Sequence, residues 1–178
     1  MLTPPLASNQ VDLPTLLRAH GPYAGRTLRY LGVREADIDD LLQEVFVVVH
    51  RRLHEYEPRQ RFESWLRVIC VNVVRNYRRS ERRRPIVSMA EPPEDAMPGG
   101  QEENLERTQM RRTLLRLLDA LPDEQRLVVV LSDIEELSVK EIAEIAGCPM
   151  KTVYSRLYAA RTTLRAAMRD LLDGEGMR

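Results

Sequence analysis

Hydrophobic residues recur three or four positions apart along most of the chain, the spacing that places them on one side of an α-helix. The clearest stripe consists of Ile38, Leu41, Leu42, Val45, Phe46, Val49 and Leu53. Comparable stripes run through residues 16–31, 62–77, 105–121, 127–131 and 139–164. The pattern therefore predicts an all-α protein.

Glycine and proline indicate where the first helices begin and end. Asp12 is placed to cap a helix that Gly32 ends. Gly21 and Pro22 interrupt this helix, and we expect them to kink it or to split it in two. Residues 56–61 contain Pro58 and no periodicity, which predicts a loop before the helix that begins at Phe62.

A stretch from Pro85 to Leu105 breaks the helical pattern. It contains four prolines, a pair of glycines and several acidic residues, but no lysine or arginine. This composition predicts a flexible linker between two domains. We therefore expect a disordered N-terminus at 1–11, a helical domain at 12–84, the linker at 85–105, and a second helical domain at 106–173.

The second domain contains a predicted helix-turn-helix. Ser138 and Glu141 have the spacing of a capping box, which starts a helix. Gly147 suits the left-handed end of that helix, and Pro149 suits the first turn of the next. A three-residue turn between two short helices is typical of DNA-binding proteins, although helical bundles without DNA also contain such turns.

The helix after this turn has one apolar side, formed by Val153, Leu157, Ala160 and Leu164. Residues 151–169 include five basic residues and no acidic one. A helix with an uncharged packing side and a basic exposed side favours contact with phosphates and base edges.

The charges of the chain cancel, with 27 basic and 27 acidic residues, but they lie in blocks. Residues 35–50 hold five acids and no lysine or arginine, whereas residues 75–84 hold six arginines and one acid. Such blocks indicate separate surfaces for separate partners.

The helix from Phe62 is predicted to be apolar on one side and polar on the other. We place Arg67, Asn72, Arg75, Asn76, Arg78 and Arg79 on the polar side, where arginine and asparagine can contact nucleic acid. Tyr56, Phe62 and Trp65 either stack on an unstacked base or belong to the core, and we favour the core for Phe62 and Trp65.

We expect no cofactor, metal or catalytic centre. Cys70 and Cys148 are isolated, and His50 and His54 are four apart without a third ligand nearby. The chain shows no signal-peptide pattern and no apolar stretch near the about eighteen residues that span a bilayer. We therefore expect a cytoplasmic protein.

Four motifs together resemble bacterial sigma factors. Residues 37–46 read DIDDLLQEVF, similar to the DLxQExF signature, and residues 62–79 read FESWLRVICVNVVRNYRR, similar to FxxWLxxIAxNxxxDxxR. Residues 120–126 and 137–161 resemble the fourth conserved region of the same family. Two such domains in a short chain resemble the extracytoplasmic-function (ECF) group of the sigma-70 family.

The resemblance implies roles by position. The polymerase-binding residues would be Asp39, Asp40, Gln43, Glu44 and Phe46, which match the helix that docks on the beta prime clamp helices. The minus-ten element would be read by Asn72, Arg75, Asn76, Arg78 and Arg79, with Arg59 and Arg61 in the loop that captures an extruded base. The minus-35 element would be read by Lys151, Thr152, Tyr154, Ser155 and Arg156, with Arg161 and Arg165 on phosphates.

Further implied partners are the beta flap of core polymerase and an anti-sigma factor. The sequence departs from the family pattern at Asn76, at Cys70 and at Tyr158 with Ala159, so the promoter sequence cannot be carried over. A stand-alone helix-turn-helix regulator remains the main alternative, and a helical protein-binding adaptor is another. The regulator would not need an acidic helix around Gln43, and the adaptor would not need two basic faces.

Overall fold

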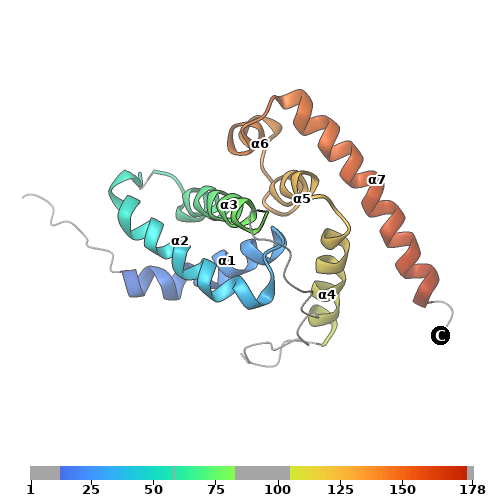
Figure 1. The fold of residues 1–178 in the computed structure, drawn as a ribbon, viewed down its shortest axis with the longest axis horizontal. Helices are drawn as coiled ribbons and strands as arrows, with labels where there is room; N and C mark the ends of the chain where they lie inside the picture. The colour runs from blue at the N-terminus through green and yellow to red at the C-terminus, as the bar shows by residue number, and fades with distance from the viewer. Residues whose placement is uncertain (1–12, 58, 83–104, 176–178) are drawn as a thin grey trace, which may run out of the picture.

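A computed structural model describes residues 13–57, 59–82 and 105–175. The helices there are α1 (Leu13–Tyr30), α2 (Ile38–Arg52), α3 (Phe62–Glu81), α4 (Leu105–Asp119), α5 (Asp123–Val129), α6 (Val139–Ala146) and α7 (Met150–Glu175) (Figure 1). Short 3-10 turns at Glu35–Asp37 and Leu53–Glu55 flank α2, and the π-helical turn Val130–Ile134 extends α5. The all-α prediction is confirmed. The expected disordered start and nearly all of the expected linker lie outside the described residues.

Helices α1, α2 and α3 form the first bundle. Their core contains Leu28, Val45, Val49 and Leu66, all fully buried, because each lies on the apolar stripe of its helix. Helix α1 is continuous through Pro22, so it is not split in two. Proline removes a single helical hydrogen bond, and buried side chains before and after it hold the two parts of the helix on the core.

Helices α4 to α7 form the second bundle, around Leu118, Leu131, Ile142 and Val153. The helix-turn-helix is present as predicted. The Ser138 hydroxyl accepts the Glu141 N–H and the Glu141 carboxylate accepts the Ser138 N–H, which completes the capping box. Gly147 ends α6 in the left-handed region, with φ of 63°.

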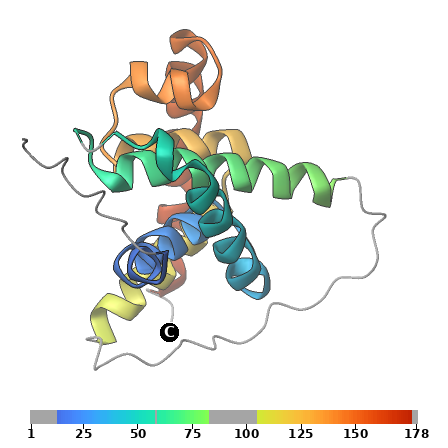
Figure 2. The same cartoon turned by 90° about the vertical axis from the view of Figure 1, so that its left-hand side faces the viewer.

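The two bundles pack against each other. Buried residues of both belong to one continuous hydrophobic core. Helix α5 lies beside α3 at the centre of the molecule, and α4 contacts α1 (Figures 1 and 2). No helix in the described part of the chain is long and apolar enough to cross a membrane.

Candidate functional site

One face of α2 is acidic and open to solvent. Asp39, Asp40, Gln43 and Glu44 are all exposed, because they lie opposite the stripe that packs on α1 and α3. Within the described residues, neither Asp40 nor Glu44 forms an ion pair. The face therefore offers unneutralised carboxylates to a partner.

Phe46 differs from the other predicted polymerase contacts. Its side chain is 3% exposed and belongs to the core of the first bundle. It lies on the stripe with Val45 and Val49, so the structure gives it a packing position rather than a surface position. The exposed apolar residue next to the acidic face is Val47.

Helix α3 has three sides rather than two. One side packs in the first bundle through Phe62, Leu66, Ile69 and Val73. A second side is polar and accessible, with Asn72, Asn76 and Arg79 exposed and Arg75 half-buried. A third side, formed by Arg67, Val71, Val74 and Arg78, is covered.

Two predictions for α3 change as a result. Arg67 was expected on the exposed polar side, but it is only 8% exposed. The Arg78 side chain is 18% exposed and engaged by the second bundle. Both residues lie on the same side as the buried Val71 and Val74, at steps of four, three and four, and this side faces the other bundle rather than solvent.

Arg67 forms a buried polar cluster with residues from two other segments. Its Nε donates to the Glu135 carboxylate at 2.9 Å and to the Tyr23 hydroxyl at 3.2 Å. The Tyr23 hydroxyl donates to the same carboxylate at 2.8 Å. Burial raises the pKa of Tyr23 to about 12, so this hydroxyl keeps its proton at neutral pH. A polar cleft of about 470 Å³ opens beside the cluster, with Arg26 and Arg61 on its rim.

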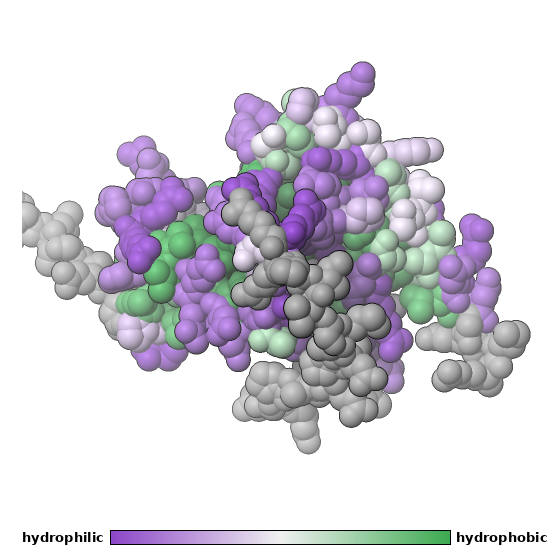
Figure 3. Space-filling view, in the orientation of Figure 1, coloured by the Kyte–Doolittle hydropathy of each residue, from purple (hydrophilic) through white to green (hydrophobic). Residues whose placement is uncertain are grey.

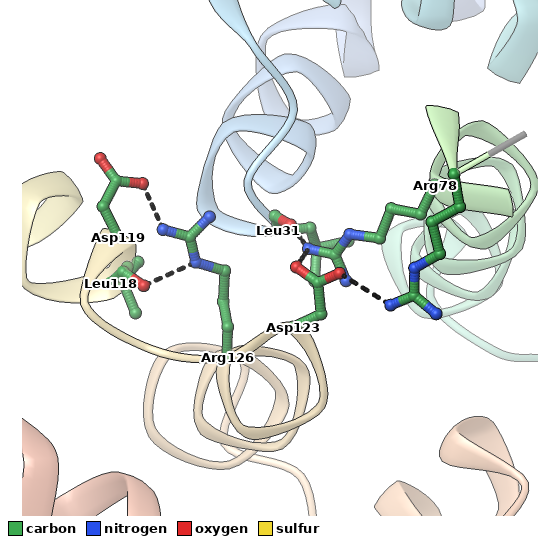
Figure 4. Close-up of polar contacts among 7 residues, drawn as sticks. Leu31, Arg78, Leu118, Asp119, Asp123 and Arg126 are labelled. Carbon is green, nitrogen blue, oxygen red and sulfur yellow. Dashed lines mark hydrogen bonds and ion pairs between the residues drawn. The ribbon is translucent and has the colours of Figure 1, made fainter. Parts of the chain in front are cut away.

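Arg78 joins α3 to the start of α5 (Figure 4). Its guanidinium lies 3.0 Å from the Asp123 carboxylate and also donates to the carbonyl of Leu31. Arg82 contacts the same carboxylate at 3.5 Å. Burial lowers the pKa of Arg78, although the group remains a cation.

Tyr56 links the segment before α3 to the first turn of that helix. The Tyr56 hydroxyl donates to the Gln60 carbonyl at 2.8 Å, and the Tyr56 ring packs on Phe62 and Trp65. Phe62 is buried, as predicted, whereas Trp65 is only half-buried. The predicted loop residues Arg59 and Arg61 are both exposed.

The N-terminal part of α7 presents the predicted recognition residues. Lys151, Tyr154 and Ser155 are exposed, and Thr152 is half-buried. Arg156 is also half-buried and lies 2.8 Å from the Glu124 carboxylate of α5. Farther along the helix, Tyr158, one of the positions where the sequence departs from the family pattern, is 76% exposed.

The two predicted phosphate contacts on α7 differ in their partners. Arg161 lies 2.8 Å from the Asp133 carboxylate. Partial burial alone would raise the pKa of Asp133, but hydrogen bonds from Arg161 and Ser132 bring it below its usual value. Arg165 is exposed, next to an apolar groove formed with Leu164, Met168 and Leu172.

Sequence reasoning missed this groove. Met168 and Leu172 are exposed at the C-terminal end of α7, and Figure 3 shows hydrophobic colour there. Their spacing of four with Leu164 continues the packing stripe beyond the part of α7 that the second bundle covers. The signal was present in the sequence, as an apolar stripe longer than the predicted helix-turn-helix requires.

Among the residues that the structure describes, no group of histidine, cysteine and carboxylate side chains is arranged to hold a metal ion. His50 and His54 are both exposed. Cys70 is fully buried, and burial raises the pKa of its thiol to about 12. Cys70 is therefore a packing residue.

Comparison with known proteins matches each of the two bundles to a known protein family model. Residues 16–84 match the model of Sigma-70 region 2, and residues 111–164 match the model of Sigma-70, region 4. The ECF RNA polymerase sigma-E factor of Escherichia coli K12 is 32% identical over 149 residues, covering 79% of this chain and 78% of the relative. The chain belongs to the ECF group of the sigma-70 family.

Other relatives agree with this assignment. The ECF RNA polymerase sigma-E factor of Haemophilus influenzae is 30% identical over 164 residues, covering 87% of this chain and 86% of the relative. CnrH, solved in complex with the cytosolic domain of CnrY, is similar with a TM-score of 0.59 and 27% identity, over 94% of this chain and 91% of CnrH. The sigma factor RpoE of Bartonella quintana, solved with the anti-sigma factor NepR, shares the fold with a TM-score of 0.64 and 22% identity, over 89% of this chain and 97% of RpoE.

The matches to the sigma-70 family assign each of the three exposed faces to one of the two regions. The acidic face of α2 and the polar face of α3 lie in the matched region 2, and the recognition residues of α7 lie in the matched region 4. The buried side of α3, which carries Arg67 and Arg78, belongs to region 2 and contacts region 4.

Proposed function

We propose that this ECF sigma factor binds core RNA polymerase, directs it to promoters with two recognition elements, and helps to open them in the cytoplasm. The observation that carries the proposal is the presence, in one chain, of an acidic face on α2 and of separate polar faces on α3 and α7. Each face suits a different partner, whereas a stand-alone regulator needs a single DNA-reading face.

The acidic face is the proposed contact with polymerase. Asp39, Asp40, Gln43 and Glu44 would meet basic residues of the beta prime clamp helices, since all four side chains are exposed and the carboxylates of Asp40 and Glu44 form no ion pair within the described residues. Phe46 would support this contact indirectly, by holding α2 on the core of the first domain. We keep 12–84 and 106–173 as the proposed limits of the two domains.

The polar face of α3 is the proposed reader of the minus-ten element. Asn72, Asn76 and Arg79 are accessible there, and asparagine and arginine pair with base edges and phosphates. The loop that carries Arg59 and Arg61 would receive an extruded base. The hydrogen bond from Tyr56 to the Gln60 carbonyl supports this role, because it holds Gln60, between the two arginines, close to the aromatic side chains at the start of α3.

The start of α7 is the proposed reader of the minus-35 element. Lys151, Tyr154 and Ser155 are exposed at the end of a helix-turn-helix, where recognition helices contact base edges. Arg165 is accessible for a phosphate contact. Arg156 and Arg161 must first leave Glu124 and Asp133, which lie within hydrogen-bonding distance of them.

We also propose control by an anti-sigma factor. Support comes from the two solved relatives, which were determined with the CnrY cytosolic domain and with NepR. The apolar groove of Leu164, Met168 and Leu172 is exposed on α7, and apolar grooves of this kind bind partner helices.

Binding to core polymerase tests the proposal. Mixed with purified core polymerase, the chain should elute with it as a stable complex in gel filtration, and the complex should retain a promoter fragment that neither component retains alone. A chain that binds DNA by itself and never elutes with polymerase would be a stand-alone regulator instead.

A further inference from the structure

The C-terminal part of α3 carries no buried side chain. The buried residues of this helix end at Val74, although the helix continues to Glu81. Figure 2 shows this end of α3, in light green, reaching past the other helices. Helix ends with few buried contacts open easily, so polar contacts must hold this one in place.

The same part of α3 carries two of the proposed contacts with the minus-ten element. Asn76 and Arg79 are exposed there. A group that binds by directed hydrogen bonds must be held within about 0.5 Å of its productive position. A side chain that is already held in place also loses less conformational freedom on binding. The position of the helix end therefore affects how well these two residues can contact DNA.

Three hydrogen-bonded side chains connect this part of α3 to the segment before α2. The Tyr77 hydroxyl donates to the Asp37 carboxylate at 2.6 Å. The Arg34 Nε donates to the same carboxylate at 2.7 Å and to the Tyr77 hydroxyl at 3.1 Å. About one turn farther along α3, the Glu81 carboxylate lies 3.4 Å from the Arg34 guanidinium. The last two turns of α3 are thus both bound to the same short segment.

The chemistry of Asp37 and Tyr77 suits a lasting hydrogen bond. Asp37 directly precedes α2, but its carboxylate does not cap that helix, so it can accept from α3 instead. The Tyr77 ring is half-buried against the core. Burial and the neighbouring Asp37 carboxylate raise the pKa of Tyr77 to about 12, so the hydroxyl keeps the proton that it donates.

Other polar contacts at this end of α3 lead to other parts of the molecule. Arg78 donates to the Leu31 carbonyl, after the end of α1. Arg78 and Arg82 also contact Asp123, but this carboxylate belongs to the second domain. Among the polar contacts of the described residues, the group around Asp37 is what links the end of α3 to the start of α2.

We propose that Tyr77 and Asp37 are positioning residues for promoter reading. Their hydrogen bond sets the direction of the last turns of α3, and with it the place of Asn76 and Arg79 relative to α2. Successive residues of an α-helix point about 100° apart, so a fixed Tyr77 also fixes the direction of its neighbour. Because the exposed face of α2 is the proposed polymerase contact, the bond gives the DNA-reading side chains a defined place on the polymerase. The inference rests on the proposed sigma function.

Amide hydrogen exchange of the free full chain tests the structural part of the proposal. Tyr77→Phe removes the hydroxyl and keeps the ring. Exchange should become about tenfold faster in the last turns of α3, because a hydrogen bond to a charged group is lost. Exchange in the part of α3 before Val74 should not change.

Asp37→Ala removes the acceptor of the same bond. It should accelerate exchange in the same turns of α3. Adding Tyr77→Phe to Asp37→Ala should cause no further acceleration, because the hydroxyl has already lost its carboxylate partner.

Promoter binding tests the positioning role. With core polymerase bound, Tyr77→Phe should weaken binding to a promoter fragment by about tenfold, whereas its affinity for core polymerase should equal that of the wild type. In a chain that already carries Asn76→Ala and Arg79→Ala, adding Tyr77→Phe should cause no further loss, because the side chains that Tyr77 positions are gone. A general loss of structure would weaken binding in both backgrounds.

Tyr30→Phe is the matched control. It removes a hydroxyl from a half-buried tyrosine of the same domain, which has no hydrogen-bond partner within the described residues. Neither the exchange at the end of α3 nor the promoter affinity should change. Circular dichroism establishes that each variant keeps its helices.

Unchanged exchange at the end of α3 in Tyr77→Phe would overturn the proposal, and so would faster exchange without any loss of promoter affinity. A loss that persists after Asn76 and Arg79 are removed would make Tyr77 a structural residue only. A wild type that never binds core polymerase would instead refute the sigma function, and the exchange result would stand by itself.

Discussion

At the residue scale, Arg67 is the most informative side chain. The sequence placed it on the polar side of its helix, yet it is buried and paired with a carboxylate 68 positions away. Helical periodicity describes one helix at a time, so it cannot reveal a partner from the other domain. The same holds for Arg78, whose partner Asp123 also comes from the second domain.

The DNA-reading role of Arg156 can be tested at this scale. Arg156→Ala should weaken binding of the polymerase complex at the minus-35 element by about 1–3 kcal/mol if the guanidinium contacts one guanine with two hydrogen bonds. Affinities for a set of single-base promoter variants measure this. Arg169→Ala, on the same helix outside the recognition part, is the control. An equal loss for every sequence would make Arg156 a phosphate contact.

The capping box of α6 gives a stability prediction. Ser138→Ala should lower the free energy of unfolding by about 0.5–2 kcal/mol, because one N–H at the helix start loses its acceptor. Urea unfolding of the variant and the wild type at neutral pH measures the difference. No measurable change would mean that solvent replaces the cap without cost.

The same box predicts a pH dependence. The hydrogen bond from Ser138 holds the pKa of Glu141 below its ordinary value of 4.5. Because the folded-state pKa is the lower one, the carboxylate stabilises the protein above pH 4.5 and loses this effect as the pH falls through the folded value. The stability difference between wild type and Glu141→Ala should therefore shrink in acid. A constant difference from pH 7 to pH 3 would contradict this assignment.

At the element scale, most helices followed from the sequence. The stripe spacing predicted α2 and α3, and the capping box with Gly147 predicted the helix-turn-helix, because these signals are local. The π-helical turn at Val130–Ile134 was not predicted, since it depends on backbone hydrogen bonds that are shifted by one residue from the α-helical pattern, such as the bond from the Glu135 N–H to the Val130 carbonyl at 3.0 Å. The third side of α3 was visible as Val71 and Val74, two valines outside the first apolar stripe.

Helix α2 carries the prediction for polymerase binding. Gln43→Ala with Glu44→Ala should weaken the complex with core polymerase, because both side chains are exposed on the acidic face and support no core packing. Titration of labelled core polymerase measures the loss, which should decrease at high salt, as expected for exposed charges. Glu55→Ala, in the turn after α2, is the control. Unchanged affinity would remove the acidic face from the polymerase contact.

At the scale of the whole molecule, the charge blocks correspond to separate surfaces. The acidic block lies on α2, and arginines of the basic block lie at the end of α3, where Asp123 neutralises part of it. A net charge of zero conceals this arrangement. The sequence predicted two domains and separate charged surfaces for separate partners, but not that one domain would pack on the arginines of the other, because that contact depends on three-dimensional packing.

Transcription from a random-sequence library is the most direct test of the sigma function. Core polymerase and this chain are incubated with templates that carry randomised upstream DNA, and the transcribed templates are sequenced. We predict transcripts that depend on the chain, from templates enriched in two separate sequence blocks, one for each proposed DNA-reading face. Transcripts that do not depend on the chain, or enrichment of one palindromic block alone, would contradict the account.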